Sequence, residues 1–194
     1  MQNWMGIHTR CGHTYYSSLL KPESTVIDLG ANRGHFSYAL SKEHGCQCFA
    51  VEPHPVLFQQ IDEREGLKKF NFAISECDGP IDFFPSENIE AGTIRKSGSS
   101  MGYQPVSISG VCFSTFLRQE HITVTELLKV DIEGAEVELF RSVSDEALKD
   151  IEQITIEFHD FIEQFKMSEE MQRIIQRLKS LDFLYINFIG NHNH

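Results

Sequence analysis

Two carboxylates, Asp28 and Glu52, each stand at the end of an apolar run that is followed by turn residues. The first run and its turn read VIDLGANRGHFS over residues 26–37, and the second run ends in AVEP over residues 50–53. In an open parallel α/β sheet, ligands bind beyond the carboxyl ends of the strands, and a carboxylate about 20 residues after the first glycine turn can accept hydrogen bonds from ribose hydroxyls. The spacing therefore indicates a nucleoside site, with Glu52 on the ribose.

The turn between residues 30 and 34 has the residue types that such a site needs. Gly30 permits a tight turn of the backbone, and Gly34 permits close packing of the following helix on the strand. Asn32 stands where a further glycine would be expected, and asparagine is one of the few other residues that tolerates a left-handed conformation. We expect Gly30, Asn32 and Gly34 to contact the ligand.

Asp28 discriminates between two kinds of nucleoside ligand. A dinucleotide site turns backbone N–H groups toward a pyrophosphate, and an acid beside it would oppose that charge. A ligand with an ammonium group and no phosphate would be attracted instead, and S-adenosylmethionine carries both an ammonium and a sulfonium. Asp28 therefore favours S-adenosylmethionine, although a nicotinamide-dependent oxidoreductase and a non-catalytic binding or scaffold protein with this fold remain alternatives.

A second group of charged residues lies in LLKVDIEGAEVELF, residues 127–140. Side chains alternate along a strand, so Lys129, Asp131 and Glu133 share one face. In ITIEFH the same alternation places Glu157 beside His159. Because buried charges require partners, we expect the ends of these two strands to meet and Lys129 to pair with Glu157.

These side chains are candidates for general acid–base chemistry. His159 is the preferred base on its ordinary pKa, near 6.5, while Asp131 would orient the cofactor or the acceptor and Glu133 is the alternative base. The same donor types suit a divalent metal, but the sequence does not show that they converge, so no metal site is predicted. Glu136 falls in a first helical turn, where interaction with the helix dipole explains it as well as catalysis.

The elements that position these residues alternate between strand and helix, which predicts a doubly wound, mostly parallel α/β sheet flanked by helices. Residues 1–22 are expected to be a capping segment of helix and loop, and residues 23–194 a single domain. A long surface loop is expected over residues 86–105. The predicted strands are 24–30, 46–53, 68–75, 79–87, 124–134, 151–159 and 183–190, and the predicted helices 33–45, 54–66, 113–119, 135–143 and 168–181.

Charge and cysteine content restrict the partners and the compartment. The 194 residues include 17 basic and 28 acidic side chains, giving a net charge of −11, so phosphate backbones and anionic lipids are repelled. No apolar stretch approaches the roughly 20 residues of a membrane span. Five cysteines without C-x-x-C spacing suit a reducing cytoplasm. We therefore expect neither nucleic acid nor membrane as a partner.

The segments VIDLGANRGHFS, AVEPHP, NFAIS, LLKVDIEGAEVELF and IEFH together resemble the S-adenosylmethionine-dependent methyltransferases of the FkbM type. The resemblance covers residues 25–160. It implies a seven-stranded Rossmann-like sheet, and S-adenosylmethionine held by Gly30, Asn32 and Glu52 with help near Ala73 and Asp131. It further implies a small-molecule or glycan acceptor, with methyl transfer to a hydroxyl oxygen of a sugar, a polyketide or another small metabolite.

The chain departs from the family pattern at two places. CFSTFL stands where the family commonly has a Leu-Asp pair before the fourth strand. The chain also stops at FIGNHNH, about where the turn into the last antiparallel strand should begin, so that strand is expected to be missing. Residues 183–190 would then form an exposed apolar edge, which invites self-association into a homo-oligomer, and the alternative expectation is that the sequence is a fragment of a longer protein.

Overall fold

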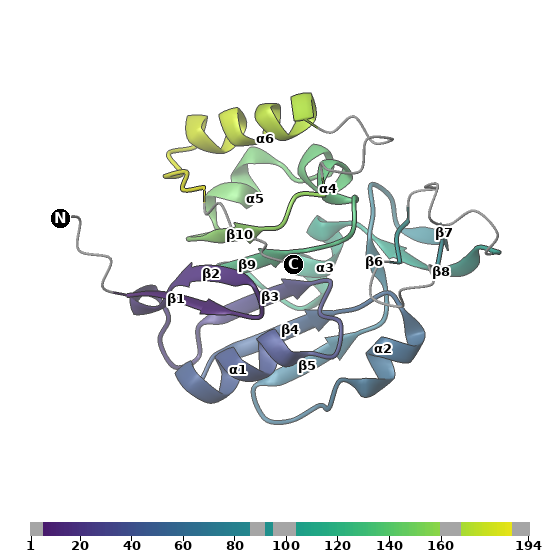
Figure 1. The fold of residues 1–194 in the computed structure, drawn as a ribbon, viewed down its shortest axis with the longest axis horizontal. Helices are drawn as coiled ribbons and strands as arrows, with labels where there is room; N and C mark the ends of the chain where they lie inside the picture. Colours follow the sequence, from purple (N-terminus) through teal and green to yellow (C-terminus); the bar gives the residue numbers. More distant parts are fainter. Residues whose placement is uncertain (1–5, 86–91, 95–103, 160–167, 188–194) are drawn as a thin grey trace, which may run out of the picture.

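The computed structural model describes residues 6–85, 92–94, 104–159 and 168–187 (Figure 1). Its centre is a five-stranded parallel sheet in the order β10-β9-β3-β4-β5. The first strand of this sheet along the chain, β3, lies in the middle, so the chain winds outward in both directions, as predicted. The strands are β3 (Thr25–Leu29), β4 (Gln47–Val51), β5 (Leu67–Phe70), β9 (Leu127–Val130) and β10 (Ile154–Ile156).

Alternation along β3 and β9 separates two cores on the two faces of the sheet. On one face, Ile27 and Leu29 pack with helices α3, α4, α5 and α6. On the other face, Val26 packs with α1 and with the N-terminal segment. The helices are α1 (His35–His44), α2 (Pro55–Gln60), α3 (Phe113–Gln119), α4 (Glu136–Ser142), α5 (Asp145–Lys149) and α6 (Ser168–Ser180). All were predicted from the sequence except α5, which is a single short turn capped by Ser144.

The predicted strand over residues 68–75 is divided between two sheets. It leaves the central sheet at Asn71, whose side-chain amide donates hydrogen bonds to the backbone oxygens of Glu52 and Pro53. The chain then enters a second sheet of order β6-β8-β7, formed by β6 (Ala73–Ile74), β7 (Gly79–Phe83) and β8 (Val106–Val111). Most of the predicted loop 86–105 lies outside the described residues, but Thr93 pairs with Phe84 beside this sheet.

The expectation of helix and loop in the N-terminal segment is wrong. The strands β1 (Ile7–Arg10) and β2 (His13–Tyr16) form an antiparallel hairpin, followed by a 3-10 turn, η1 (Ser17–Leu19). Cys11 and Gly12 at the hairpin turn both have positive φ, +48° and +82°. A two-residue turn with positive φ at both positions matches the right-handed twist of the flanking strands, which is why the hairpin forms here.

The predicted last strand is also wrong over the part that the structure describes. Residues 183–187 follow α6 without strand pairing, and residues 188–190 lie outside the described ranges. Seven strands were expected in the sheet, and five are present in the described part of the chain. No helix in the described ranges is long and apolar enough to cross a membrane.

Candidate active site

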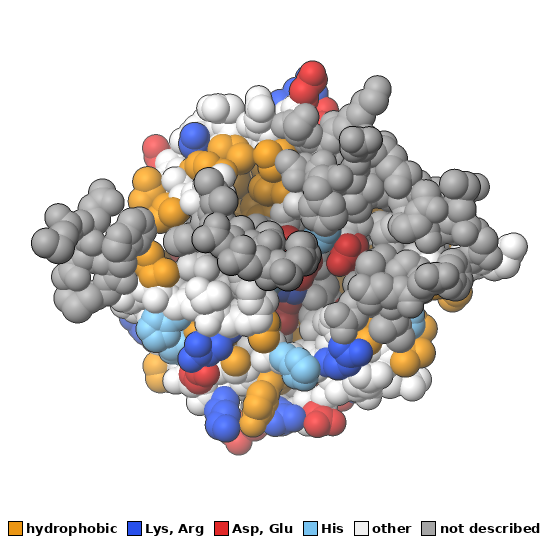
Figure 2. All heavy atoms as spheres, in the orientation of Figure 1, with side chains coloured by type: hydrophobic (Ala, Val, Ile, Leu, Met, Phe, Trp, Pro, Cys, Tyr) orange, Lys and Arg blue, Asp and Glu red, His pale blue; other side chains and the backbone are white. Residues whose placement is uncertain are grey.

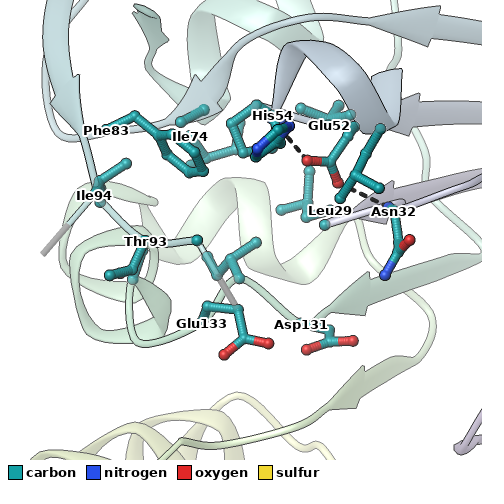
Figure 3. Close-up of a pocket in the computed structure, with 18 of the residues that line it drawn as sticks. Leu29, Asn32, Glu52, His54, Ile74, Phe83, Thr93, Ile94, Asp131 and Glu133 are labelled. Carbon is teal, nitrogen blue, oxygen red and sulfur yellow. Dashed lines mark hydrogen bonds between the residues drawn. The ribbon is translucent and has the colours of Figure 1, made fainter. Parts of the chain in front are cut away.

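A cavity of about 190 Å³ lies at the carboxyl ends of β3, β4, β9 and β10 (Figure 3). Small-molecule sites typically have volumes of about 300–1,000 Å³, so this cavity is smaller than most of them. Most of the predicted site residues line it: Gly30, Asn32, Glu52, Ala73, Asp131, Glu133 and His159. Asp28 and Gly34 do not. Figure 2 shows acidic and histidine side chains gathered near the centre of the corresponding face.

The turn after β3 has the backbone geometry that its residues predict. Gly30 has a φ of +76°, and a Cβ atom there would lie 1.7 Å from the backbone oxygen of Asp131. Only glycine fits, because the turn passes directly against the loop after β9. Asn32 adopts the predicted left-handed conformation, with a φ of +53°. Gly34 has a φ of +75°, and a Cβ atom there would lie 2.9 Å from Ile61 of the α2 region, so its role is packing.

Glu52 follows β4 and is 5% exposed. Its Oε2 accepts a hydrogen bond from the backbone N–H of Asn32 (2.8 Å), and its Oε1 accepts one from the backbone N–H of His54 (2.7 Å; dashed lines in Figure 3). Burial raises the pKa of Glu52 to about 7, although these two hydrogen bonds act in the opposite direction. The carboxylate is therefore fixed in orientation at the edge of the cavity, with lone pairs left to accept further hydrogen bonds.

Asp28 does not reach the cavity, which corrects the expectation that it contacts the ligand. Its side chain is fully buried on the α1 face of the sheet. One oxygen accepts a hydrogen bond from the Ser37 hydroxyl (2.7 Å), and the other lies 3.1 Å from the Lys129 ammonium. Asp28 thus contributes to the site through Lys129.

The predicted ion pair between Lys129 and Glu157 is wrong. The register of the sheet pairs Lys129 with Thr155, so Glu157 lies one pleat further along, level with Asp131, and is exposed. Lys129 is 4% exposed, and its ammonium lies 3.4 Å from Asp131 and donates to the backbone oxygen of Gly30 (2.6 Å). Burial alone would lower the pKa of Lys129, but the carboxylates of Asp28 and Asp131 raise it. Lys129 therefore ties β3 to the loop after β9.

Asp131, Glu133 and His159 converge at the far side of the cavity from Glu52. His159 Nε2 lies 3.4 Å from Glu133 and 3.7 Å from Asp131, and its Nδ1 lies 2.9 Å from Glu136. Burial lowers the pKa of His159, but the hydrogen bond to Glu136 and the surrounding carboxylates raise it to about 9. The imidazole is therefore charged at neutral pH. The expectation of a free base with a pKa near 6.5 is incorrect for this environment.

The two carboxylates of the cluster differ in their ionisation. Burial raises the pKa of Glu133 to about 7. Burial opposes ionisation of Asp131 as well, but the hydrogen bond with His13 and the charge of Lys129 hold its pKa at about 2. Glu133 also has a left-handed backbone, with a φ of +51°, which lets the tight loop before α4 turn its side chain into the cavity.

His13 is the residue of this cluster that the sequence did not predict. It comes from the N-terminal hairpin, is 4% exposed, and its Nε2 lies 3.3 Å from Asp131. Gly12 lies between two short runs of alternating side chains, and this pattern indicates a β-hairpin. It does not indicate where the hairpin packs on the rest of the molecule.

A parallel sheet with its first strand in the middle, a glycine turn after that strand and an acid after the next is the architecture of the Rossmann-like fold, which methyltransferases share with dinucleotide-binding enzymes. Comparison with known sequences gives the family. The model of the methyltransferase FkbM domain matches residues 28–185, and the chain belongs to this family. It is also similar to methyltransferase sdnD of Sordaria araneosa, with 24% identity over 181 residues. The match covers 75% of this chain and 70% of the relative. No solved structure matches the chain significantly.

Proposed function

We propose that this protein transfers a methyl group from S-adenosylmethionine to a hydroxyl oxygen of a small molecule or glycan. The observation that carries the proposal is Glu52, whose two carboxylate oxygens are fixed by backbone N–H groups at the edge of the cavity, beside the turn formed by Gly30 and Asn32. Membership of a methyltransferase family weighs against the nicotinamide-dependent alternative.

The residues around the cavity fit an adenosine with a positive group at its other end. The ribose hydroxyls would donate to Glu52, and the apolar side chains of Ile74 and Phe83 next to it would contact the base (Figure 3). Across the cavity, Asp131 and Glu133 supply negative charge for the sulfonium and the ammonium. Asp28 supports this end indirectly, since it shares Lys129 with Asp131.

The protein has two tasks in methyl transfer to an alcohol. When bound, S-adenosylmethionine supplies an electrophilic methyl group, whose bond to sulfur breaks as the bond to the acceptor oxygen forms. The chain must align the hydroxyl group and receive its proton. Asp131 and Glu133 face the cavity and can accept a hydrogen bond from that hydroxyl. His159, held as a cation by Glu136, would balance their charge and keep them in place.

The acceptor is proposed as a class: a sugar, a polyketide or another hydroxylated metabolite. The end of the cavity opposite Glu52 is acidic, so it should bind neutral hydroxyl compounds more tightly than phosphorylated ones. A phosphate would be repelled by Asp131, Glu133 and Glu157. We also propose a reducing cytoplasmic location, since all five cysteines are free thiols.

The proposal is tested by incubating the protein with methyl-labelled S-adenosylmethionine and a panel of neutral sugars, polyketide alcohols and phosphorylated sugars. We expect label on an oxygen atom of a neutral acceptor, located by mass spectrometry, and much less label with Glu52→Gln when the cofactor is limiting. Label on nitrogen or carbon would overturn the hydroxyl assignment. Tight binding of the cofactor with no transfer to any acceptor would favour the non-catalytic alternative.

A further inference from the structure

Three atoms of metal-ligand type converge at the far end of the cavity, where a bound ion would take the place of the Nε2 proton of the charged His159. They are one oxygen each of Asp131 and Glu133 and the Nε2 atom of His159, and all three lie within 4.8 Å of one another. Ligand atoms around a transition metal lie about 2.0–2.2 Å from the ion, which places neighbouring ligands roughly 3 to 4 Å apart. The observed distances of 3.4 and 3.7 Å from His159 Nε2 fall in this range. We infer that Asp131, Glu133 and His159 form a binding site for a divalent transition-metal ion.

The support behind His159 has the form that metal-binding histidines require. A ligating imidazole usually passes its other ring N–H to a carboxylate, which fixes the ring and its tautomer. Here Nδ1 lies 2.9 Å from the carboxylate of Glu136, which is fully buried. The same carboxylate oxygen accepts hydrogen bonds from the backbone N–H groups of Ile132 and Gly134. Glu136 thus fixes both His159 and the loop that carries Glu133.

The charges around the cluster also favour a cation. Asp28, Asp131, Glu133, Glu136 and Glu157 are all carboxylates of this region, and among the described residues Lys129 is their permanently charged partner. Its ammonium lies 3.4 Å from Asp131 Oδ2, and His13 contacts the same oxygen at 3.3 Å. The opposite oxygen, Oδ1, faces His159. Because Lys129 and His13 are on the Oδ2 side, they can orient Asp131 without occupying the position of the ion.

The donor set indicates which ion would bind. Two carboxylate oxygens and one imidazole nitrogen suit Mn²⁺, Fe²⁺ or Zn²⁺, whereas Ca²⁺ takes six to eight oxygen ligands. The three residues line the cavity, so the remaining coordination positions face the space where an acceptor would lie. A role for the ion in holding the acceptor oxygen rests on the proposed function, but the binding of the ion does not.

The test is a titration of metal-stripped, tag-free protein with Mn²⁺ in the absence of cofactor, followed by the loss of the free Mn²⁺ signal in electron paramagnetic resonance. We expect one ion per chain. His159→Ala and Glu133→Gln should each weaken binding at least tenfold, and Glu136→Gln, which acts through His159, by about 10- to 100-fold. Glu146→Gln, at an exposed acid of α5, is the matched control and should bind as the parent does.

Circular dichroism establishes that each variant is folded, and Asp131→Asn replaces any that is not. Failure of the parent protein to bind Mn²⁺, or equal affinity in the parent and all cluster variants, would overturn the assignment. Because no cofactor or acceptor is present, either result is independent of whether the protein transfers methyl groups.

Discussion

At the residue scale, Glu52 is the side chain whose environment is explained best by a ligand. A carboxylate with 5% exposure and a pKa raised to about 7 is costly for the folded chain, yet its backbone partners hold it facing a cavity. Its position was predictable because an acid at the end of a strand is visible in the sequence. Its raised pKa was not, since that depends on burial by residues distant in the sequence.

Replacing Glu52 with Gln should weaken S-adenosylmethionine binding at least tenfold. The neutral amide retains the shape but loses hydrogen bonds to a charged acceptor, worth roughly 1.5–3 kcal/mol each. Isothermal titration calorimetry measures the effect, with the exposed Glu63→Gln as the matched control. An unchanged dissociation constant in Glu52→Gln would exclude Glu52 as the ribose acceptor.

The raised pKa of Glu52 also predicts how cofactor affinity changes with pH. Ribose hydroxyls donate to the ionised carboxylate, so binding favours the deprotonated form and should tighten as pH rises through about 7. The dissociation constant should therefore fall between pH 6 and pH 8 and then level off. In Glu52→Gln this dependence should be smaller, and an identical pH profile for parent and variant would assign the titration to another group.

Lys129 is the second residue on which the site depends. Removing its ammonium in Lys129→Met leaves the buried Asp28 without its ionic partner, and breaking a buried pair typically costs about 3–5 kcal/mol. Urea denaturation should show this loss in the free energy of unfolding. The double variant Lys129→Met with Asp28→Asn should recover part of it, because the stranded charge is then absent. Additive losses in the double variant would show that the two side chains are not coupled.

At the element scale, the strands and helices that carry the site were predictable, but the contacts between them were only partly so. The pattern VIDLG followed by a glycine turn gives β3 and the start of α1 directly. The register of β10 against β9 was not predictable, and a difference of one pleat removed Glu157 from Lys129. The hairpin that brings His13 to Asp131 was missed because its strands are only four residues long.

The close approach of the turn after β3 to the loop after β9 gives a direct test at this scale. Gly30→Ala should be destabilised by more than the roughly 1–2 kcal/mol of a left-handed alanine, because the new methyl group overlaps the Asp131 backbone oxygen. Gly12→Ala is a matched control, since Gly12 has a similar φ of +82° and a Cβ atom there would meet no atom within 4 Å. Equal melting temperatures for the two variants would contradict the close approach.

At the scale of the whole molecule, the doubly wound sheet was predictable from the alternation of strands and helices, whereas its C-terminal end was not. The apolar residues 183–186 and the following Asn187 predicted a strand, but they form none. A strand forms only where it can pair with the free edge of a sheet, and the apolar character of a segment does not show whether such an edge lies beside it.

We nevertheless expect the protein to self-associate through this segment. Leu184 is 86% exposed, and Tyr185 and Ile186 beside it are 43% and 41% exposed. Contiguous exposed apolar side chains mark contact surfaces. Light scattering after gel filtration should show a dimer or larger species, and Leu184→Glu should shift it toward the monomer. A monomer at all concentrations in the parent protein would refute this expectation.

The central claim, that the cavity binds S-adenosylmethionine, is tested most directly by calorimetric titration of one protein sample with S-adenosylmethionine, S-adenosylhomocysteine and NAD. We predict saturable binding of both adenosyl ligands, one per chain, with no comparable binding of NAD, because a pyrophosphate would face Asp131 and Glu133. Saturable binding of NAD without binding of either adenosyl ligand would contradict the account.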